Sequence, residues 1–169
     1  SYEMFMGCEA LTSVTSNATY IASEAFLGCS QLTSVTYSKG LRVIGDPSFA
    51  NCASLKSINL YKNTVLGYSP FDSCFNLSEV YIEEGFKAIV DDAFRSCSSL
   101  KSITLPNSLE SIGMNAFAGT KLTELVIPKN VSYIADNAFS GLTTLTKVEI
   151  QSPLNEIGNS VFKGCSSLE

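Results

Sequence analysis

One phenylalanine recurs along the chain at a nearly constant interval. Its eight copies are separated by 21, 23, 22, 23, 23, 22 and 23 residues and are Phe5, Phe26, Phe49, Phe71, Phe94, Phe117, Phe139 and Phe162. A leucine stands five or six residues after each copy and begins an L-x-x-V-x-I pattern. Another apolar residue, most often isoleucine, stands five residues before each copy after the first. Self-similarity at such a period predicts a solenoid whose turns pack only on their neighbours.

Within each unit, the L-x-x-V-x-I pattern predicts a short strand, because alternate side chains of a strand point to the same face. The differences in unit length fall mostly between this strand and the isoleucine column, which marks an adjustable loop. A bundle of amphipathic helices could have a similar period. The alternating β-branched residues, and the Pro or Gly that often follows them, leave little room for a ten-residue helix and favour the solenoid.

The most regular unit, AFRSCSSLKSITLPNSLESIGMNAF at residues 93–117, resembles the BspA-like leucine-rich repeat, also called the Treponema-type repeat. The resemblance covers essentially the whole chain, with departures at residues 17–20 and 63–69. It implies an α/β-type repeat solenoid of about seven repeats of 21–23 residues, wound as a right-handed superhelix. Short parallel strands would lie on its concave side and mostly irregular, short 3-10 or helical segments on its convex side. Proteins of this kind are found mostly on bacterial and protist surfaces, which implies an extracellular or cell-surface location.

We expect residues 1–169 to form a single solenoid domain that is an excerpt of a longer array. The sequence opens on the phenylalanine column and stops within a strand, and neither end has the polar outer face of a capping repeat. No apolar run approaches the roughly 18 residues of a membrane span, and the first ten residues lack the basic and apolar regions of a signal peptide. We therefore expect no membrane insertion by this segment.

The six cysteines share one column of the repeat. Each lies three residues after a repeat phenylalanine, at Cys8, Cys29, Cys52, Cys74, Cys97 and Cys165. Thr120 and Leu142 occupy the same column in two other units, which favours a buried packing position. Disulfides between adjacent turns remain an alternative. Zinc binding is disfavoured, because there is no C-x-x-C pair and no histidine.

Catalytic motifs are missing from the sequence. Without histidine, neither a Ser-His-Asp nor a Cys-His arrangement can form within this segment. The acidic pairs Glu83–Glu84 and Asp91–Asp92 are interpreted as solvated loop charges, and the glycines occupy turn columns rather than a phosphate-binding loop. We therefore expect no enzyme activity and no cofactor. The net charge of −5 and the scattered basic residues also argue against a nucleic-acid partner.

The outward positions of the predicted strands offer the one candidate site. Most carry Ser, Thr or Pro, but the central units differ and place exposed tyrosine beside hydrogen-bond acceptors. The predicted ligand-contact patch comprises Asn59, Tyr61, Glu79, Tyr81, Glu83, Glu124 and Val126. Cross-strand tyrosine packing without any ligand is the alternative.

These features favour a non-enzymatic interaction or adhesion module of a cell-surface or secreted repeat protein. Its concave face would bind a protein or glycan ligand of a host or matrix, because a solenoid offers a long surface without a deep pocket. Two alternatives are a structural spacer without its own ligand and an accessory arm of a larger enzyme.

Overall fold

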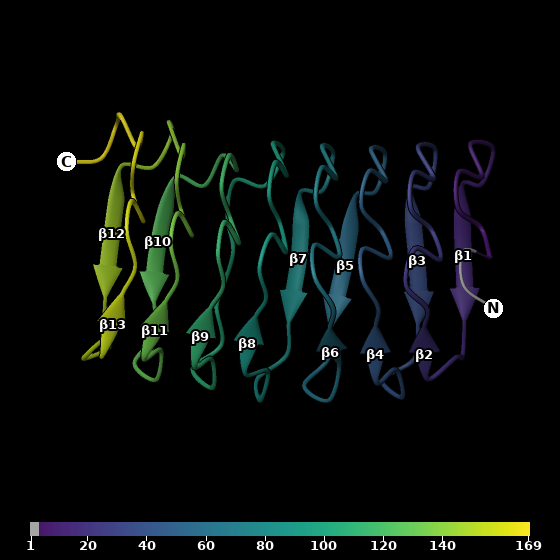
Figure 1. Cartoon of the computed structure of the whole chain (residues 1–169), viewed down its shortest axis with the longest axis horizontal. Helices are drawn as coiled ribbons and strands as arrows, with labels where there is room; N and C mark the ends of the chain where they lie inside the picture. The colour runs from purple at the N-terminus through teal and green to yellow at the C-terminus, as the bar shows by residue number, and fades with distance from the viewer. Residues whose placement is uncertain (1–3) are drawn as a thin grey trace.

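The computed structural model describes residues 4–169 as an elongated stack of turns whose two chain ends lie at opposite ends of the stack (Figure 1). One side carries four-residue strands, here called the long-strand face: β1 (Ser13–Ser16), β3 (Ser34–Tyr37), β5 (Ser57–Leu60), β7 (Glu79–Ile82), β10 (Glu124–Ile127) and β12 (Lys147–Ile150). All observed pairings are parallel. The predicted solenoid and its strand column are confirmed.

A second ladder lies where only an apolar column was predicted. Its two-residue strands form the short-strand face: β2 (Tyr20–Ile21), β4 (Val43–Ile44), β6 (Val65–Leu66), β8 (Ala88–Ile89), β9 (Ser111–Ile112), β11 (Tyr133–Ile134) and β13 (Glu156–Ile157). The remaining described residues form turns, bends and irregular segments. Of the two forms expected for the convex segments, the irregular one is confirmed, and no helix of either kind occurs within residues 4–169.

The repeat phenylalanines form a continuous stack through the core. Neighbouring ring centroids are 5.1 to 5.8 Å apart and the ring planes are within 21° of parallel. The five central rings, from Phe49 to Phe139, are completely buried. Since each of these five rings stacks between two others, the column couples each of these turns to both of its neighbours.

The long-strand ladder is interrupted, and the prediction of a strand in the most regular unit is wrong. The ladder pairs β1 with β3, β5 with β7 and β10 with β12, while residues 102–105 form no strand. Glu83 follows β7 and donates its amide to the carbonyl of Leu60 at 2.8 Å. Pro106 and Pro128 follow the next two predicted strands and have no N–H to donate. The closing hydrogen bond is therefore lost on both sides of residues 102–105.

Aspartates join neighbouring turns beside the short strands. The Oδ1 atom of Asp91 accepts a hydrogen bond from the Met114 amide at 2.7 Å, and that of Asp136 accepts one from the Asn159 amide at 2.6 Å. Gly113 makes room for the first contact, because a Cβ atom there would lie 2.5 Å from both the amide nitrogen and Oδ1 of Asp91. The Ile-Gly pair of the repeat is thus explained by the close approach of the preceding turn.

We expect Gly113→Ala to lower the free energy of unfolding by about 2 kcal/mol, because the added methyl group must displace backbone of the preceding turn. For a chain of this size, that loss lowers the Tm by about 4 to 8 °C, measurable by thermal denaturation. Gly40→Ala is the matched control, since its Cβ would meet only the Ser38 hydroxyl at 3.2 Å. Equal losses for the two variants would contradict the steric explanation.

Candidate ligand-binding surface

Three of the seven predicted patch residues line one hollow on the long-strand face. The hollow has a volume of about 580 Å³ and extends over β5, β7 and the irregular residues 102–104. Asn59, Glu79 and Tyr81 belong to its lining. The strand register places Asn59 directly opposite Tyr81 and Ser57 opposite Glu79. The sheet interruption beside β7 therefore coincides with the centre of the predicted patch.

The lining of this hollow combines aliphatic and polar side chains and has one exposed aromatic ring. The Tyr81 side chain is 53% exposed, and Ser57, Ser78, Ser102 and Thr104 contribute hydroxyl groups to the same lining. Glu79 supplies the carboxylate and Asn59 the amide, and no Lys or Arg is part of the lining. Such a surface can stack a flat group on Tyr81 and form hydrogen bonds around it.

Tyr61 and Glu83 lie at the end of the strands, where the chain turns inward, so they are not the open surface positions that the strand alternation predicted. Tyr61 is half-buried, with its ring edge-on to that of Tyr37 at a centroid distance of 6.0 Å. The Nζ atom of Lys39 lies 5.6 Å from the Tyr61 ring centroid and 2.9 Å from Oε1 of Glu83. The backbone amide of Lys62 donates to the other Glu83 oxygen at 3.1 Å.

These contacts form a clamp across three turns, defined by Lys39, Tyr61 and Glu83. The hydrogen bond from the Lys62 amide, together with that from Lys39, lowers the pKa of the Glu83 carboxyl. Hydrogen bonding and charge attraction from Glu83 raise the pKa of Lys39. The clamp leaves Tyr61 and Glu83 with internal partners, and Glu83 directly follows Ile82, which lines the hollow.

Glu124 and Val126 are separated from the hollow by the irregular segment. Both lie on β10 with exposed side chains, and their strand partners on β12 are Lys147 and Glu149. Neither belongs to the lining, which ends at Thr104. The structure therefore divides the predicted patch into a hollow, a clamp and a separate part on β10.

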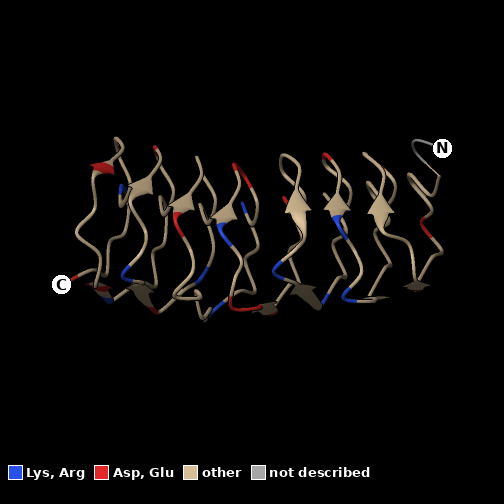
Figure 2. Ribbon diagram, turned by 90° about the horizontal axis from the view of Figure 1, so that it is seen from below, with Lys and Arg blue, Asp and Glu red and all other residues tan. Residues whose placement is uncertain are grey.

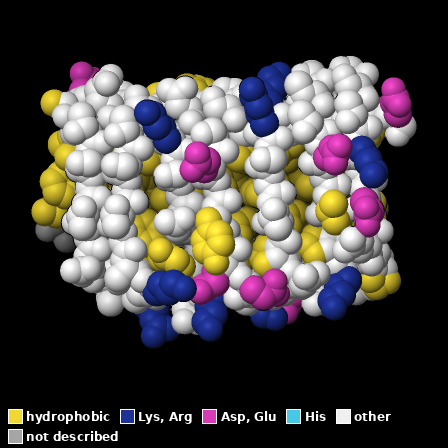
Figure 3. All heavy atoms as spheres, turned by 180° about the vertical axis from the view of Figure 1, so that it is seen from behind, with side chains coloured by type: hydrophobic (Ala, Val, Ile, Leu, Met, Phe, Trp, Pro, Cys, Tyr) yellow, Lys and Arg dark blue, Asp and Glu magenta, His cyan; other side chains and the backbone are white. Residues whose placement is uncertain are grey.

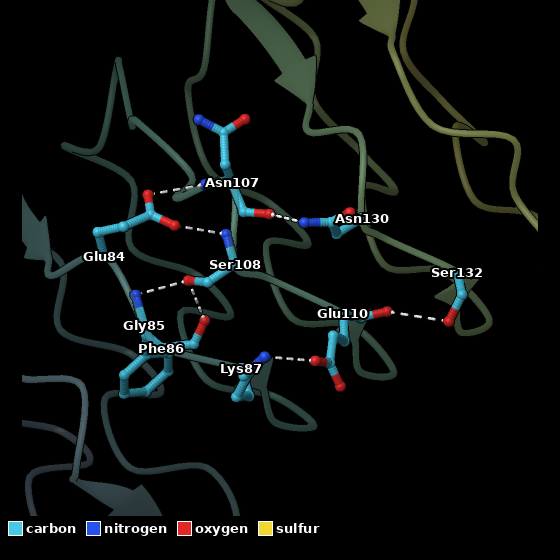
Figure 4. Close-up of polar contacts among 9 residues, drawn as sticks. All are labelled: Glu84, Gly85, Phe86, Lys87, Asn107, Ser108, Glu110, Asn130 and Ser132. Carbon is cyan, nitrogen blue, oxygen red and sulfur yellow. Dashed lines mark hydrogen bonds and ion pairs between the residues drawn. The ribbon is translucent and has the colours of Figure 1, made fainter.

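Turn carboxylates replace some of the ladder bonds that the prolines remove. Glu84 accepts hydrogen bonds from the amides of Asn107 at 3.0 Å and Ser108 at 2.7 Å (Figure 4). The Ser108 hydroxyl accepts from the Gly85 amide and donates to the Phe86 carbonyl. The pair Glu83–Glu84, interpreted from the sequence as solvated charges, thus holds neighbouring turns together.

The cysteine column is a packing column, as predicted. All six thiols are free, and Cys29, Cys52, Cys74 and Cys97 are completely buried. Five of them donate a hydrogen bond to the carbonyl of the phenylalanine one turn earlier, at 3.0 to 3.3 Å. Burial is the main cause that raises the pKa of Cys52 and of Cys97 to about 12. A thiol this hard to ionise is a poor nucleophile.

Charged side chains are distributed along the whole stack. Acidic and basic residues occur on turns throughout its length (Figure 2), and the face seen from behind shows both signs with hydrophobic side chains between them (Figure 3).

Within the described part of the chain, no group of three or more potential metal ligands is present. No helix long and apolar enough to cross a membrane was found among residues 4–169.

Comparisons with known proteins relate the chain to one repeat family. The family model described as "BspA type Leucine rich repeat region" matches residues 1–85 and 64–169, with six copies. No curated protein matches the chain.

Solved structures show the same architecture. The Treponema pallidum leucine-rich repeat protein TpLRR has a TM-score of 0.62 and 26% identity, over 76% of this chain and 72% of that one. A leucine-rich cell surface protein from Faecalibacterium prausnitzii has a TM-score of 0.50 and 22% identity, over 99% of this chain but 61% of its own. The pneumococcal vaccine antigen PcpA has a TM-score of 0.52 and 22% identity, over 95% of this chain and 56% of its own. The chain therefore spans less than two thirds of the last two proteins, and these two likenesses concern the fold alone.

Proposed function

Because the chain belongs to the BspA-type leucine-rich repeat family, we propose that it is a non-enzymatic interaction module of a cell-surface or secreted protein. Its ligand is a protein or glycan that binds the long-strand face. The F. prausnitzii relative is a cell surface protein, which supports this location. The repeat fold supports the interaction role, since it presents a long open sheet rather than an enclosed cavity.

The hollow around Tyr81 is the observation that carries the proposal. A half-exposed tyrosine with an amide, a carboxylate and hydroxyl groups around it has the composition of an interface hot spot. The clamp at the end of β7 supports the role of the hollow, because contacts that restrain this strand end lower the entropy lost when a ligand binds. Glu124 and Val126 would contribute only to a ligand long enough to cross residues 102–105.

We expect Tyr81→Ser to weaken attachment of the purified chain to host cells or matrix-coated surfaces at least ten-fold. The ring supplies the largest exposed apolar area in the hollow, and hot-spot tyrosines contribute about 2 kcal/mol or more. Attachment is measured by surface plasmon resonance or a plate assay over a concentration series.

Tyr20→Ser is the matched control, because Tyr20 is similarly exposed (51%) but lies on the short-strand face. Tyr61→Ser is unsuitable as a test, since it removes the packing against Tyr37 and Lys39. If wild type and Tyr81→Ser attach equally, the hollow is not the contact. If neither attaches to any surface, the spacer interpretation replaces the binding one.

A further inference from the structure

A second hollow lies on the short-strand face, where that ladder is broken. The short strands form two sheets, β2–β4–β6 and β8–β9–β11–β13, with no pairing between β6 and β8. A hollow of about 410 Å³ covers this break. The surface is hollow here because Ala88 and Ser111, which occupy the outward positions of β8 and β9, have small side chains. Tyr133 stands beyond them on β11, in register with Ser111.

Two carboxylates at the edge of this hollow are oriented but carry no counter-charge. Oδ1 of Asp91 accepts from the Met114 amide at 2.7 Å, and Oδ1 of Asp46 accepts from the Tyr68 amide. None of the ion pairs found within residues 4–169 includes either aspartate. The second oxygen of each carboxylate accepts no hydrogen bond from the described residues, and no Lys or Arg lines the hollow.

A tyrosine lies on the turn between the two turns that carry these aspartates. The Tyr68 amide binds Asp46 of the preceding turn, and the amide of the next residue, Ser69, donates to the Asp91 carbonyl of the following turn at 3.1 Å. Adjacent turns of parallel strands are about 4.8 Å apart, so Tyr68 has one carboxylate-bearing residue on each side. Its side chain is 65% exposed, and that of Tyr133 across the hollow is 40% exposed.

We propose that this hollow binds an arginine side chain from an extended segment of a partner protein. The guanidinium group is flat, cationic and weakly hydrated, so it can stack on the Tyr68 ring while the carboxylates of Asp46 and Asp91 supply negative charge and free hydrogen-bond acceptors. The aliphatic stem of the arginine packs on Ala88 and Tyr133. Charge complementarity favours this ligand over an acidic one, since the hollow has two uncompensated carboxylates and the whole chain carries a net charge of −5.

The site is independent of the hollow around Tyr81, which lies on the other strand face. The aspartates also have a structural part in holding the next turn, but one oxygen is enough for that contact. Asp136 is a structural counterpart outside the hollow: its Oδ1 accepts from the Asn159 amide at 2.6 Å, and its carboxylate also accepts from the Asn159 side-chain amide. Substituting Asp136 therefore removes a turn contact of the same kind without changing the lining of the hollow.

The test is an NMR titration of the isotope-labelled chain with the peptide acetyl-Gly-Gly-Arg-Gly-Gly-amide. We expect saturable shifts of the Tyr68 and Met114 amide signals. The same peptide with citrulline, a neutral isostere of arginine, should bind at least ten-fold more weakly. Asp91→Asn and Tyr68→Ser should each weaken arginine-peptide binding at least ten-fold, and Asp136→Asn should leave it unchanged.

Equal binding of the arginine and citrulline peptides would overturn the proposal, as would equal losses in Asp91→Asn and Asp136→Asn. Shifts of the same amides with a neutral sugar such as maltotriose, but not with the arginine peptide, would reassign the hollow to glycan binding. Tyr68→Ser keeps the test valid if Asp91→Asn unfolds, since the Tyr68 side chain is mostly exposed.

Discussion

Replacing Phe94 with alanine is expected to lower the free energy of unfolding by about 4 kcal/mol, a large part of the stability of an ordinary domain. The Phe94 ring is completely buried, 5.6 Å from the Phe71 centroid and 5.4 Å from that of Phe117. The substitution leaves a cavity in the middle of the stack, and the turns on either side lose a shared contact. Because a solenoid is stabilised by nearest-neighbour contacts, we expect its two halves to unfold in separate steps.

Urea denaturation followed by circular dichroism measures this change, and hydrogen exchange identifies the half that opens first. Phe94→Leu keeps most of the volume and should cost clearly less than the alanine variant. Phe162→Ala should also cost less, because Phe162 is only half-buried and stacks on a single described ring, that of Phe139. A loss below about 1 kcal/mol for Phe94→Ala would show that the stack does not couple the turns.

The repeat columns predicted most of the fold, because each column is a set of side chains with the same environment in every turn. Because a column describes all turns together, it does not show where a single turn differs from the others. Pro106 makes unit 93–117 look typical of its family, yet with Pro128 it removes the backbone donors that would close the ladder around residues 102–105. A sequence pattern records the side chains that repeat, whereas this interruption coincides with backbone hydrogen bonds that are missing on both sides of a single segment.

The candidate site was only partly predictable for a related reason. Alternation along a strand correctly identified Asn59, Glu79 and Tyr81 as outward residues that are neighbours on adjacent turns. It could not predict that Glu83 pairs with Lys39, because these residues are 44 positions apart in the sequence and lie two turns apart in the stack. The hollow on the short-strand face was missed because Asp46, Tyr68 and Asp91 occupy a column, two residues after the apolar one, in which the residue type changes from turn to turn.

Raising the pH from 8 to 10.5 is expected to destabilise the chain by about 4 kcal/mol through two core thiols alone. The pKa of Cys52 and that of Cys97 are each raised from 9.0 to about 12, mainly by burial. The unfolded chain therefore releases these protons at lower pH than the folded one. Their contribution to stability is complete below about pH 9 and is lost as the pH rises toward 12. The raised pKa of Cys74 acts in the same direction.

Urea denaturation at pH 8, 9, 9.75 and 10.5, in the presence of a phosphine reductant, measures the slope. The control is the triple variant Cys52→Thr, Cys74→Thr and Cys97→Thr, because threonine already occupies this column at Thr120 and its hydroxyl donates to the Phe117 carbonyl at 2.9 Å. The variant should lose much less stability over the same range. Its remaining loss of stability belongs to other groups such as Tyr37, whose pKa is raised mainly by burial and to a smaller extent by Tyr61. The difference between the two slopes isolates the thiols, and parallel slopes would mean that the cysteine column is not buried in its neutral form.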